Sequence, residues 1–207
     1  MIERNGRHLD LLVSDLVDVS RIESGRFAVN LEAIQPEAVI REILTGLEAI
    51  TSEKHQQIVG QYDLNGAWVR ADRARLGQVL TNLVSNACKY SPEKTDITVT
   101  CAIEGHELVI VVRDQGLGIS KADQEKLFTP FFRSTNDEAQ KQKGTGLGLV
   151  ITRSIVETHG GTLDLESEIG KGTAITIRMP DVMSEPGEKP THGQEQKTLR
   201  SGSKDAA

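Results

Sequence analysis

The chain has 207 residues, with 24 Lys and Arg against 30 Asp and Glu and a formal charge of −6. This acidic excess argues against a general binder of nucleic acids or anionic membranes, because both need basic surfaces. Aromatic residues make up only 3% of the sequence, and the two cysteines, Cys88 and Cys101, form no C-x-x-C pair. These counts argue against aromatic platforms that stack on the bases of single-stranded nucleic acids and against a typical zinc site. With no apolar run long enough to cross a bilayer and no signal peptide, we expect a soluble, cytoplasmic chain.

The first 25 residues predict an amphipathic helix that ends near Gly25. Its apolar residues recur at heptad spacing and form one stripe: Ile2, Leu9, Leu12, Val13, Leu16, Val19 and Ile22. A single helix cannot bury such a stripe by itself. The helix therefore either packs on its own domain or belongs to a bundle or dimer interface.

The rest of the pattern predicts an α+β domain with one sheet and helices on one face. We expect extended segments at 27–34, 57–63, 67–70, 95–103, 107–113, 162–168 and 173–179, and helices at 36–52, 72–89, 120–127 and 146–159. The turn signal Asn65-Gly66 joins 57–63 to 67–70, and a polar loop covers 129–143. From Asp181 onward the composition predicts a disordered tail.

The helix predicted over 72–89 has two contrasting faces. One face is apolar, and a narrow polar stripe follows the other side: Gln78, Asn82, Asn86 and Lys89. Asparagine is unfavourable inside a helix because its side-chain amide competes with the backbone for hydrogen bonds. An amide oxygen can ligate Mg²⁺, and an ammonium can pair with phosphate oxygens. The stripe therefore indicates either a ligand site or a solvated face.

The segment Asp114-Gln115-Gly116-Leu117-Gly118-Ile119 follows the predicted buried strand 107–113. A carboxylate at a strand end can accept hydrogen bonds from the exocyclic amine of a base. Two glycines would let the backbone approach a flat ligand closely. The same residues could form a plain turn between strand and helix, so the motif alone leaves both interpretations open.

A second glycine-rich segment, Gly144-Thr145-Gly146-Leu147-Gly148-Leu149, leads into the helix predicted over 146–159. Free backbone amides at a helix N-terminus favour phosphate. The segment lacks the Lys-Ser/Thr ending of a Walker loop, and a polar loop rather than a strand precedes it. By itself it is weak evidence for any one ligand.

Together and in this order, the motifs resemble the nucleotide site of sensor histidine kinases, within the wider GHKL group of ATPases. Residues 82–90 resemble the family's N box, 114–119 its first glycine box and 144–149 its second. The run Phe128-Thr129-Pro130-Phe131-Phe132-Arg133 resembles the F box, and Gly170-Lys171-Gly172-Thr173 resembles the short motif near the end. The resemblance covers residues 27–180. The preceding helix, ending Ser20-Arg21-Ile22-Glu23-Ser24-Gly25, resembles the second helix of the dimerisation hairpin.

The resemblance implies a two-layer α+β sandwich, with a mixed sheet and helices on one face, that binds ATP and Mg²⁺. Asp114 would hold the adenine amino group, Asn86 would ligate Mg²⁺, and Asn82 and Lys89 would complete the catalytic set. The stretch 129–143 would form a mobile lid over the nucleotide. The other residues implied to contact the nucleotide are Tyr90, Gly116, Gly118, Ile119, Arg133, Lys143, Gly144, Thr145, Gly146, Leu147, Gly148, Leu149 and Thr173.

The resemblance also implies an activity and a domain organisation. Such kinases transfer the γ-phosphoryl group of ATP to a histidine, and an aspartate in the receiver domain of a response regulator then accepts it. The chain would comprise a hairpin remnant (1–26), an ATP-binding catalytic domain (27–180) and a tail (181–207). A homodimer through helix 1–25 would follow if the full hairpin were present. No nucleic acid or membrane contact is expected, although the chain could be the cytoplasmic part of a membrane-anchored kinase.

The sequence departs from the family at the phosphoryl acceptor. The family's acceptor histidine is followed by an acidic residue and an Arg-Thr-Pro type run, which no histidine here matches. His8 lies in the segment that resembles the second hairpin helix, and His159 is expected to be a packing residue at a helix end. We therefore expect either the C-terminal piece of a longer kinase or a short protein that acts on a histidine elsewhere.

Two other functions are open from the sequence. The chain could be a non-catalytic module that senses ATP or docks on a partner through its N-terminal stripe. It could also be a GHKL serine kinase of the anti-sigma type. The hairpin-like helix and the F box favour the histidine kinase.

Overall fold

Five strands form the main sheet of the computed structural model, which describes residues 2–180 and 182–183, with the side chains of the first helix described from Leu12 onward. Their order across the sheet is β2-β4-β5-β7-β6. The bounds are Gln57–Asp63 (β2), Asp96–Glu104 (β4), Glu107–Arg113 (β5), Gly172–Met179 (β7) and Thr162–Glu168 (β6). β2 runs parallel to β4, and the other pairs are antiparallel. The sheet is therefore mixed, as predicted.

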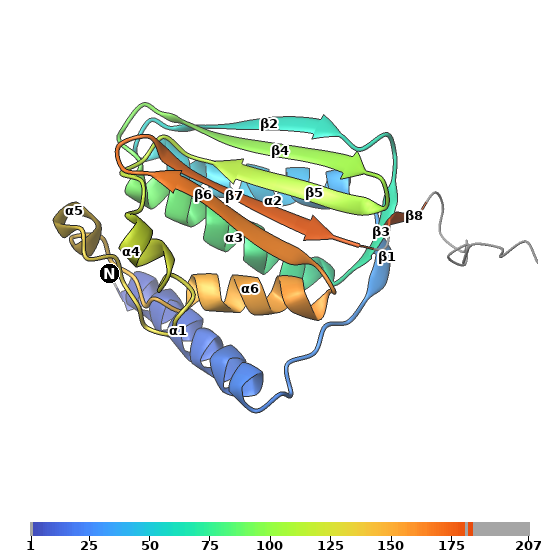
Figure 1. The fold of residues 1–207 in the computed structure, drawn as a ribbon, viewed down its shortest axis with the longest axis horizontal. Helices are drawn as coiled ribbons and strands as arrows, with labels where there is room; N and C mark the ends of the chain where they lie inside the picture. Colours follow the sequence, from blue (N-terminus) through green and yellow to red (C-terminus); the bar gives the residue numbers. More distant parts are fainter. Residues whose placement is uncertain (1, 181, 184–207) are drawn as a thin grey trace, which may run out of the picture.

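The long helices cover one face of this sheet (Figure 1). They are α2 (Pro36–Ser52), α3 (Arg73–Tyr90) and α6 (Gly148–Thr158), with α1 (Ile2–Glu23) packed against α6. Asp72 caps the start of α3, and its Oδ1 accepts a hydrogen bond from the Arg75 amide at 3.0 Å, as expected for an N-cap aspartate. The α+β two-layer fold is confirmed. No helix of the described residues is long and apolar enough to span a membrane.

The core lies between α2, α3, α6 and the inner face of the sheet. Leu80 of α3 and Leu108 and Ile110 of β5 are fully buried, as the apolar run over 108–112 predicts. At the end of α6, the buried His159 accepts a hydrogen bond from the Asp72 amide at Nε2 and pairs with the Ile155 carbonyl at Nδ1. His159 is thus a packing residue at a helix end, as expected.

A second, small sheet was not predicted. It contains β1 (Glu32–Ile34), β3 (Trp68–Ala71) and β8 (Val182–Met183), with β3 in the middle. The Asn65-Gly66 turn forms, with positive φ at both residues, but β2 and β3 do not pair with each other. The turn residues fix the local backbone and leave the pairing partner open, so the expectation of one sheet was wrong. The predicted tail lies outside the described residues apart from β8.

Two further helices are short. α4 (Lys121–Gln124) is shorter than the helix predicted over 120–127, and α5 (Asp137–Gln140) adds one turn to the predicted loop 129–143. Ser120 and Asn136 cap these turns through side-chain oxygens, which explains why two brief helical turns form in polar segments.

One face of α1 docks on the rest of the molecule. Val19 is buried in the core, and the buried Asp18 carboxylate accepts hydrogen bonds from Arg75 at 2.6 and 3.1 Å and from Gln78 at 3.0 Å. Burial of Asp18 opposes its ionisation, but these bonds outweigh that effect and lower its pKa. The Arg75 guanidinium also lies over the ring of Phe27, 4.8 Å from the ring centre. α1 is therefore held by a buried, bidentate ion pair.

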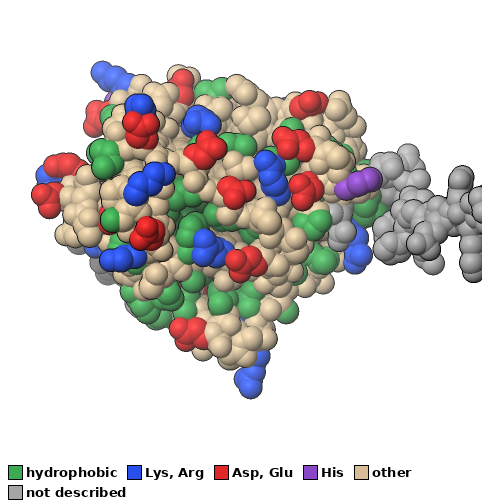
Figure 2. All heavy atoms as spheres, in the orientation of Figure 1, with side chains coloured by type: hydrophobic (Ala, Val, Ile, Leu, Met, Phe, Trp, Pro, Cys, Tyr) green, Lys and Arg blue, Asp and Glu red, His purple; other side chains and the backbone are tan. Residues whose placement is uncertain are grey.

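The opposite face of α1 is apolar and exposed. Val13, Leu16 and Val17 have 54%, 50% and 44% of their surface accessible. In the orientation of Figure 2, hydrophobic side chains gather along the lower part of the molecule, where Figure 1 places α1 and α6. The predicted stripe is therefore divided: Val19 and Ile22 pack on the core, whereas Val13 and Leu16 face outward.

Asp18→Asn is expected to release α1 while leaving α3 and the sheet intact. Breaking one side of a buried ion pair costs about 3 kcal/mol, so amides over 15–23 should exchange with solvent at least tenfold faster. In the parent, the contribution of this pair is present above the ordinary pKa of 3.8 and is lost as the pH falls through the lower pKa of the folded state. Hydrogen exchange followed by mass spectrometry measures both effects.

Asp15→Asn is the matched control, because Asp15 lies on the same helix and has no ion pair among the described contacts. Removing its charge relieves repulsion with Asp18, so protection of α1 should stay the same or rise. Equal exchange in the Asp18→Asn variant and the parent would show that the ion pair does not hold the helix.

Candidate functional site

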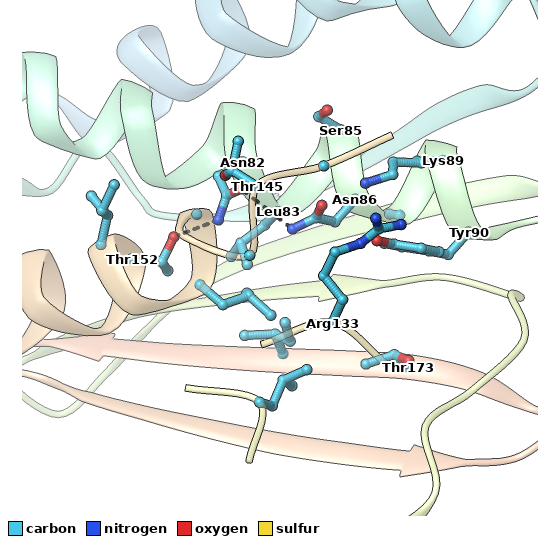
Figure 3. Close-up of a pocket in the computed structure, with 18 of the residues that line it drawn as sticks. Asn82, Leu83, Ser85, Asn86, Lys89, Tyr90, Arg133, Thr145, Thr152 and Thr173 are labelled. Carbon is cyan, nitrogen blue, oxygen red and sulfur yellow. Dashed lines mark hydrogen bonds between the residues drawn. The ribbon is translucent and has the colours of Figure 1, made fainter. Parts of the chain in front are cut away.

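A cavity of about 630 Å³ opens between α3, the ends of β5 and β7, the 129–143 loop and the start of α6. This volume lies in the range of small-molecule sites. Figure 3 shows side chains from these separate segments pointing into it. The residues predicted for the site line this cavity except for Gly116 and Leu147: Asn82, Asn86, Lys89, Tyr90, Asp114, Gly118, Ile119, Arg133, Lys143, Gly144, Thr145, Gly146, Gly148, Leu149 and Thr173.

The polar stripe of α3 is oriented by a chain of hydrogen bonds. Asn82 donates from Nδ2 to the Thr152 hydroxyl of α6 at 2.8 Å, and Asn86 donates from Nδ2 to Asn82 Oδ1 at 3.3 Å (Figure 3). This order leaves Asn86 Oδ1 with no hydrogen-bond partner in the described part of the chain. The free oxygen is an uncharged hard ligand, which suits a cation such as Mg²⁺.

Asp114 is fixed from both sides by backbone amides. Its Oδ1 accepts hydrogen bonds from Gly116 at 2.8 Å and Thr173 at 3.1 Å, and its own amide donates to the Thr173 carbonyl at 2.8 Å. Burial raises the pKa of the Asp114 carboxyl, and the two backbone hydrogen bonds oppose that shift. Oδ2 has no such partner among the described contacts, so it is the oxygen left for a ligand donor. Gly116 therefore orients Asp114 instead of lining the cavity.

Two glycines are required by close approaches at the cavity wall. Gly118 has φ +66°, and a side chain there would collide with the Glu168 backbone. A Cβ at Gly148 would collide with Asn82 Oδ1. The first turn of α6 therefore lies directly against the amide stripe of α3.

The side chain of Leu147 does not line the cavity but is buried in the core at 1% exposure. That its backbone helps to hold phosphates stays a prediction. Its amide donates to the Thr145 hydroxyl at 3.2 Å. An apolar residue that precedes a packed helix is drawn into the core, so Leu147 anchors the glycine-rich segment behind the cavity.

The loop over 129–143 is tied together by its own polar groups. Arg133 donates from Nη2 to the carbonyls of Gln140 at 2.8 Å and Gln142 at 2.6 Å. The buried Asp123 carboxylate accepts from the Ser134 hydroxyl at 2.6 Å and from the Thr135 amide at 2.9 Å. Arg133 therefore lines the cavity and also holds the loop in shape (Figure 3).

The sequence did not reveal every residue at the cavity. Leu12, Ser14 and Asp15 of α1 line it together with the motif residues. Heptad spacing identifies which residues of α1 are apolar but not which side of the helix meets the cavity. Thr152 was also missed, because one threonine in a helix carries no signal without its partner Asn82. Around the hollow of Figure 2, acidic and basic side chains are interspersed.

The family to which these motifs belong is given by sequence comparison. Residues 71–183, more than half of the chain, match the family described as "Histidine kinase-, DNA gyrase B-, and HSP90-like ATPase". The chain belongs to this ATPase family. The match covers α3, both glycine-rich segments, the loop over 129–143 and the strands that position Asp114 and Thr173, but not α1. Membership indicates that the cavity binds a nucleotide.

Relatives of this ATPase domain are sensor kinases. The sensor histidine kinase WalK of Bacillus subtilis is 38% identical over 171 residues, which is 82% of this chain and 28% of WalK. The chain thus spans less than a third of that relative. The histidine kinase AdeS of Acinetobacter baumannii has a similar structure, with a TM-score of 0.69 and 26% identity over 86% of this chain and 81% of that one. ShkA, solved in complex with AMPPNP, has a TM-score of 0.73 and 25% identity over 88% of this chain and 38% of that one.

Thr152→Val tests the orientation of the amide stripe in this ATPase domain. Valine keeps the shape and removes the acceptor for Asn82, which frees the Asn82 and Asn86 amides to rotate. We expect the ATP affinity measured with Mg²⁺ to fall about tenfold, with a loss of unfolding free energy of about 1 kcal/mol. Titration calorimetry and thermal unfolding measure the two quantities.

Thr158→Val is the control on the same helix, because the exposed Thr158 hydroxyl donates only to the Ser154 carbonyl. Its ATP affinity should equal that of the parent. An unchanged affinity in Thr152→Val would rule out the hydrogen-bond chain as the feature that orients the asparagines.

Proposed function

We propose that the chain is the ATP- and Mg²⁺-binding catalytic domain of a two-component sensor histidine kinase. The observation that carries the proposal is that Asn86, Asp114 and the glycine-rich segment 144–149 surround one cavity. Each comes from a different part of the fold, and each offers a group suited to a different part of the nucleotide. The bound AMPPNP of the similar ShkA structure supports a nucleotide as the ligand.

The residues fit the parts of Mg²⁺-ATP. Asp114 Oδ2 would accept the adenine amino group, and Asn86 Oδ1 would ligate the cation. The ammonium groups of Lys89 and Lys143 and the backbone of the glycine-rich segment would hold phosphate oxygens. Gly116 would keep Asp114 oriented through its amide. The rest of the pocket would be made by Asn82, Tyr90, Gly118, Ile119, Arg133, Gly144, Thr145, Gly146, Gly148, Leu149 and Thr173.

Phosphoryl transfer requires positioning and charge stabilisation more than covalent chemistry from the protein. When bound, Mg²⁺ would supply part of the charge neutralisation. In this chain the half-buried Asp114 would fix one end of the nucleotide, and Lys89 and the start of α6 would fix the other, so the terminal phosphate would be directed along the α3 stripe. A histidine brought to that end would receive the phosphoryl group and pass it to an aspartate of a response regulator.

The α1 helix supports a second part of the proposal. Its exposed residues Val13, Leu16 and Val17 form a surface that a second hairpin helix could cover. We infer a homodimer through this helix when a complete hairpin is present. The same surface is the observation that favours the alternative function, a non-catalytic module that binds ATP and docks on a partner.

Asp114→Asn is expected to abolish measurable ATP binding. The amide can still accept hydrogen bonds from Gly116 and Thr173 at Oδ1, but it presents an N–H group toward the adenine amine. Because burial raises the pKa of Asp114, the ionised carboxyl destabilises the folded parent above that pKa. The variant should therefore unfold at the same or a higher temperature at pH 7. Calorimetric titration and thermal unfolding test both statements.

Asp164→Asn, an exposed position on β6, makes the same charge change away from the cavity and should bind ATP as the parent does. Parental affinity in Asp114→Asn would remove Asp114 from the adenine site. Absence of binding in the folded parent would contradict the ATP-binding role itself.

The phosphoryl acceptor separates the candidate functions. We expect the chain, incubated with Mg²⁺ and labelled ATP, to label a separately purified hairpin that carries an acceptor histidine. The label should be lost in acid and kept in base, as for phosphohistidine. An acid-stable label would indicate a serine kinase, and ATP binding without any label would favour the non-catalytic module.

A further inference from the structure

The C-terminal end of α3 is held by a residue from outside the cavity. The last carbonyls of any helix have no partner within the helix. Here Lys54, in the loop after α2, donates from Nζ to the carbonyls of Cys88, Lys89 and Ser91 at 3.0, 3.0 and 3.1 Å. One ammonium therefore holds three carbonyls at this end of the helix, and Lys54 is not among the residues that line the cavity.

The loop that carries Lys54 is itself fixed. The Lys54 carbonyl accepts a hydrogen bond from the Lys94 amide at 3.0 Å, and His55 has a positive φ of 53°, which turns the chain sharply after Lys54. The buried Gln56 then donates to the Cys88 carbonyl at 3.2 Å and to the Pro92 carbonyl at 2.8 Å. The half-buried Lys54 side chain is thus directed at the helix end by a rigid turn.

The end of α3 also holds the first glycine-rich segment. The Tyr90 carbonyl accepts a hydrogen bond from the Leu117 amide at 3.2 Å, and a Cβ at Gly116 would lie 2.7 Å from that carbonyl. Lys89 Nζ lies 2.8 Å from the Cβ position of Gly144. The last turn of α3 therefore joins the adenine side of the cavity to the second glycine-rich segment.

Electrostatics gives the lysine a second effect. The C-terminus of a helix carries partial negative charge, which disfavours an anion nearby. Lys89 lies in this last turn, and its Nζ is 2.8 Å from the Cβ position of Gly144, in the segment that would hold the phosphates. The Lys54 ammonium offsets that negative end without occupying the cavity.

We propose that Lys54 is a positioning residue for phosphate binding, which acts by fixing the last turn of α3 and offsetting its negative end. This inference rests on the proposed function, since it concerns how the same cavity binds the triphosphate. Lys54 acts through the backbone of Lys89 and does not touch the nucleotide. Its effect should fall on the phosphate part of the ligand and leave the adenosine part almost unchanged.

The test compares ATP with adenosine in Lys54→Gln, which removes the charge and keeps one amide donor. We expect the Kd for ATP to rise about tenfold, equivalent to about 1.4 kcal/mol, and the Kd for adenosine to stay within about twofold of the parent. Lys54→Arg keeps the charge and should retain ATP affinity within about threefold. Titration calorimetry gives the ATP values, and displacement titrations give those for adenosine.

Lys94→Gln is the matched control, because it removes the same charge from an exposed position whose amide bonds the Lys54 carbonyl. It should bind both ligands as the parent does. If Lys54→Gln weakens the binding of ATP and of adenosine equally, Lys54 only supports the fold and the proposal is wrong. Parental ATP affinity in Lys54→Gln would also overturn it. If the folded parent binds ATP no more tightly than adenosine, the cavity does not bind the phosphates, and this result contradicts the proposed function itself.

Discussion

The rotation of α3 about its own axis is the constraint on which both the core and the cavity depend. Leu76, Leu80 and Leu83 are almost fully buried, and burying one such side chain is worth about 2 kcal/mol. A shift of the helix by one residue would turn it by 100°, expose these leucines and push Asn82 and Asn86 into the core. The same packing that stabilises the domain therefore holds the amide stripe toward the cavity.

Given that rotation, the site is completed by hydrogen bonds that leave Asn86 Oδ1 and Asp114 Oδ2 without a partner among the described contacts. The Thr152 hydroxyl accepts a hydrogen bond from the Asn82 amide, and Asn82 Oδ1 accepts one from the Asn86 amide. Asp114 Oδ1 accepts two hydrogen bonds from backbone amides. Groups held in this way need little reorganisation when a ligand arrives, because their internal hydrogen bonds already fix the side-chain rotamers. The cavity is thus shaped for its ligand by contacts that can be traced to the sheet and to α6.

The sequence was most informative where several local signals agreed. Three motifs carried the prediction: the asparagines on a polar helical stripe, the aspartate after a buried strand and the glycine-rich segment before a helix. Each alone could also be a feature without a ligand, yet their order predicted one site. The structure brings them together. Contacts between distant segments could not be predicted. Lys54 at the end of α3, Thr152 beside Asn82 and the pairing of β3 with β1 depend on tertiary packing, which local spacing does not encode.

The helix α1 has one face that packs against the ATPase domain and lines the cavity, and another face that is exposed to a partner. At 100° per residue, Val19 and Ile22 lie on nearly the opposite side of the helix from Val13 and Val17, so docking on the ATPase domain leaves the exposed apolar face available. The docked face brings Leu12, Ser14 and Asp15 to the cavity wall, and the Asp18–Arg75 pair sets the distance between the helix and α3. A partner that rotates or withdraws α1 must therefore break this ion pair and change the wall of the cavity at the same time. The position of α1 and the shape of the cavity are thus linked through this shared wall.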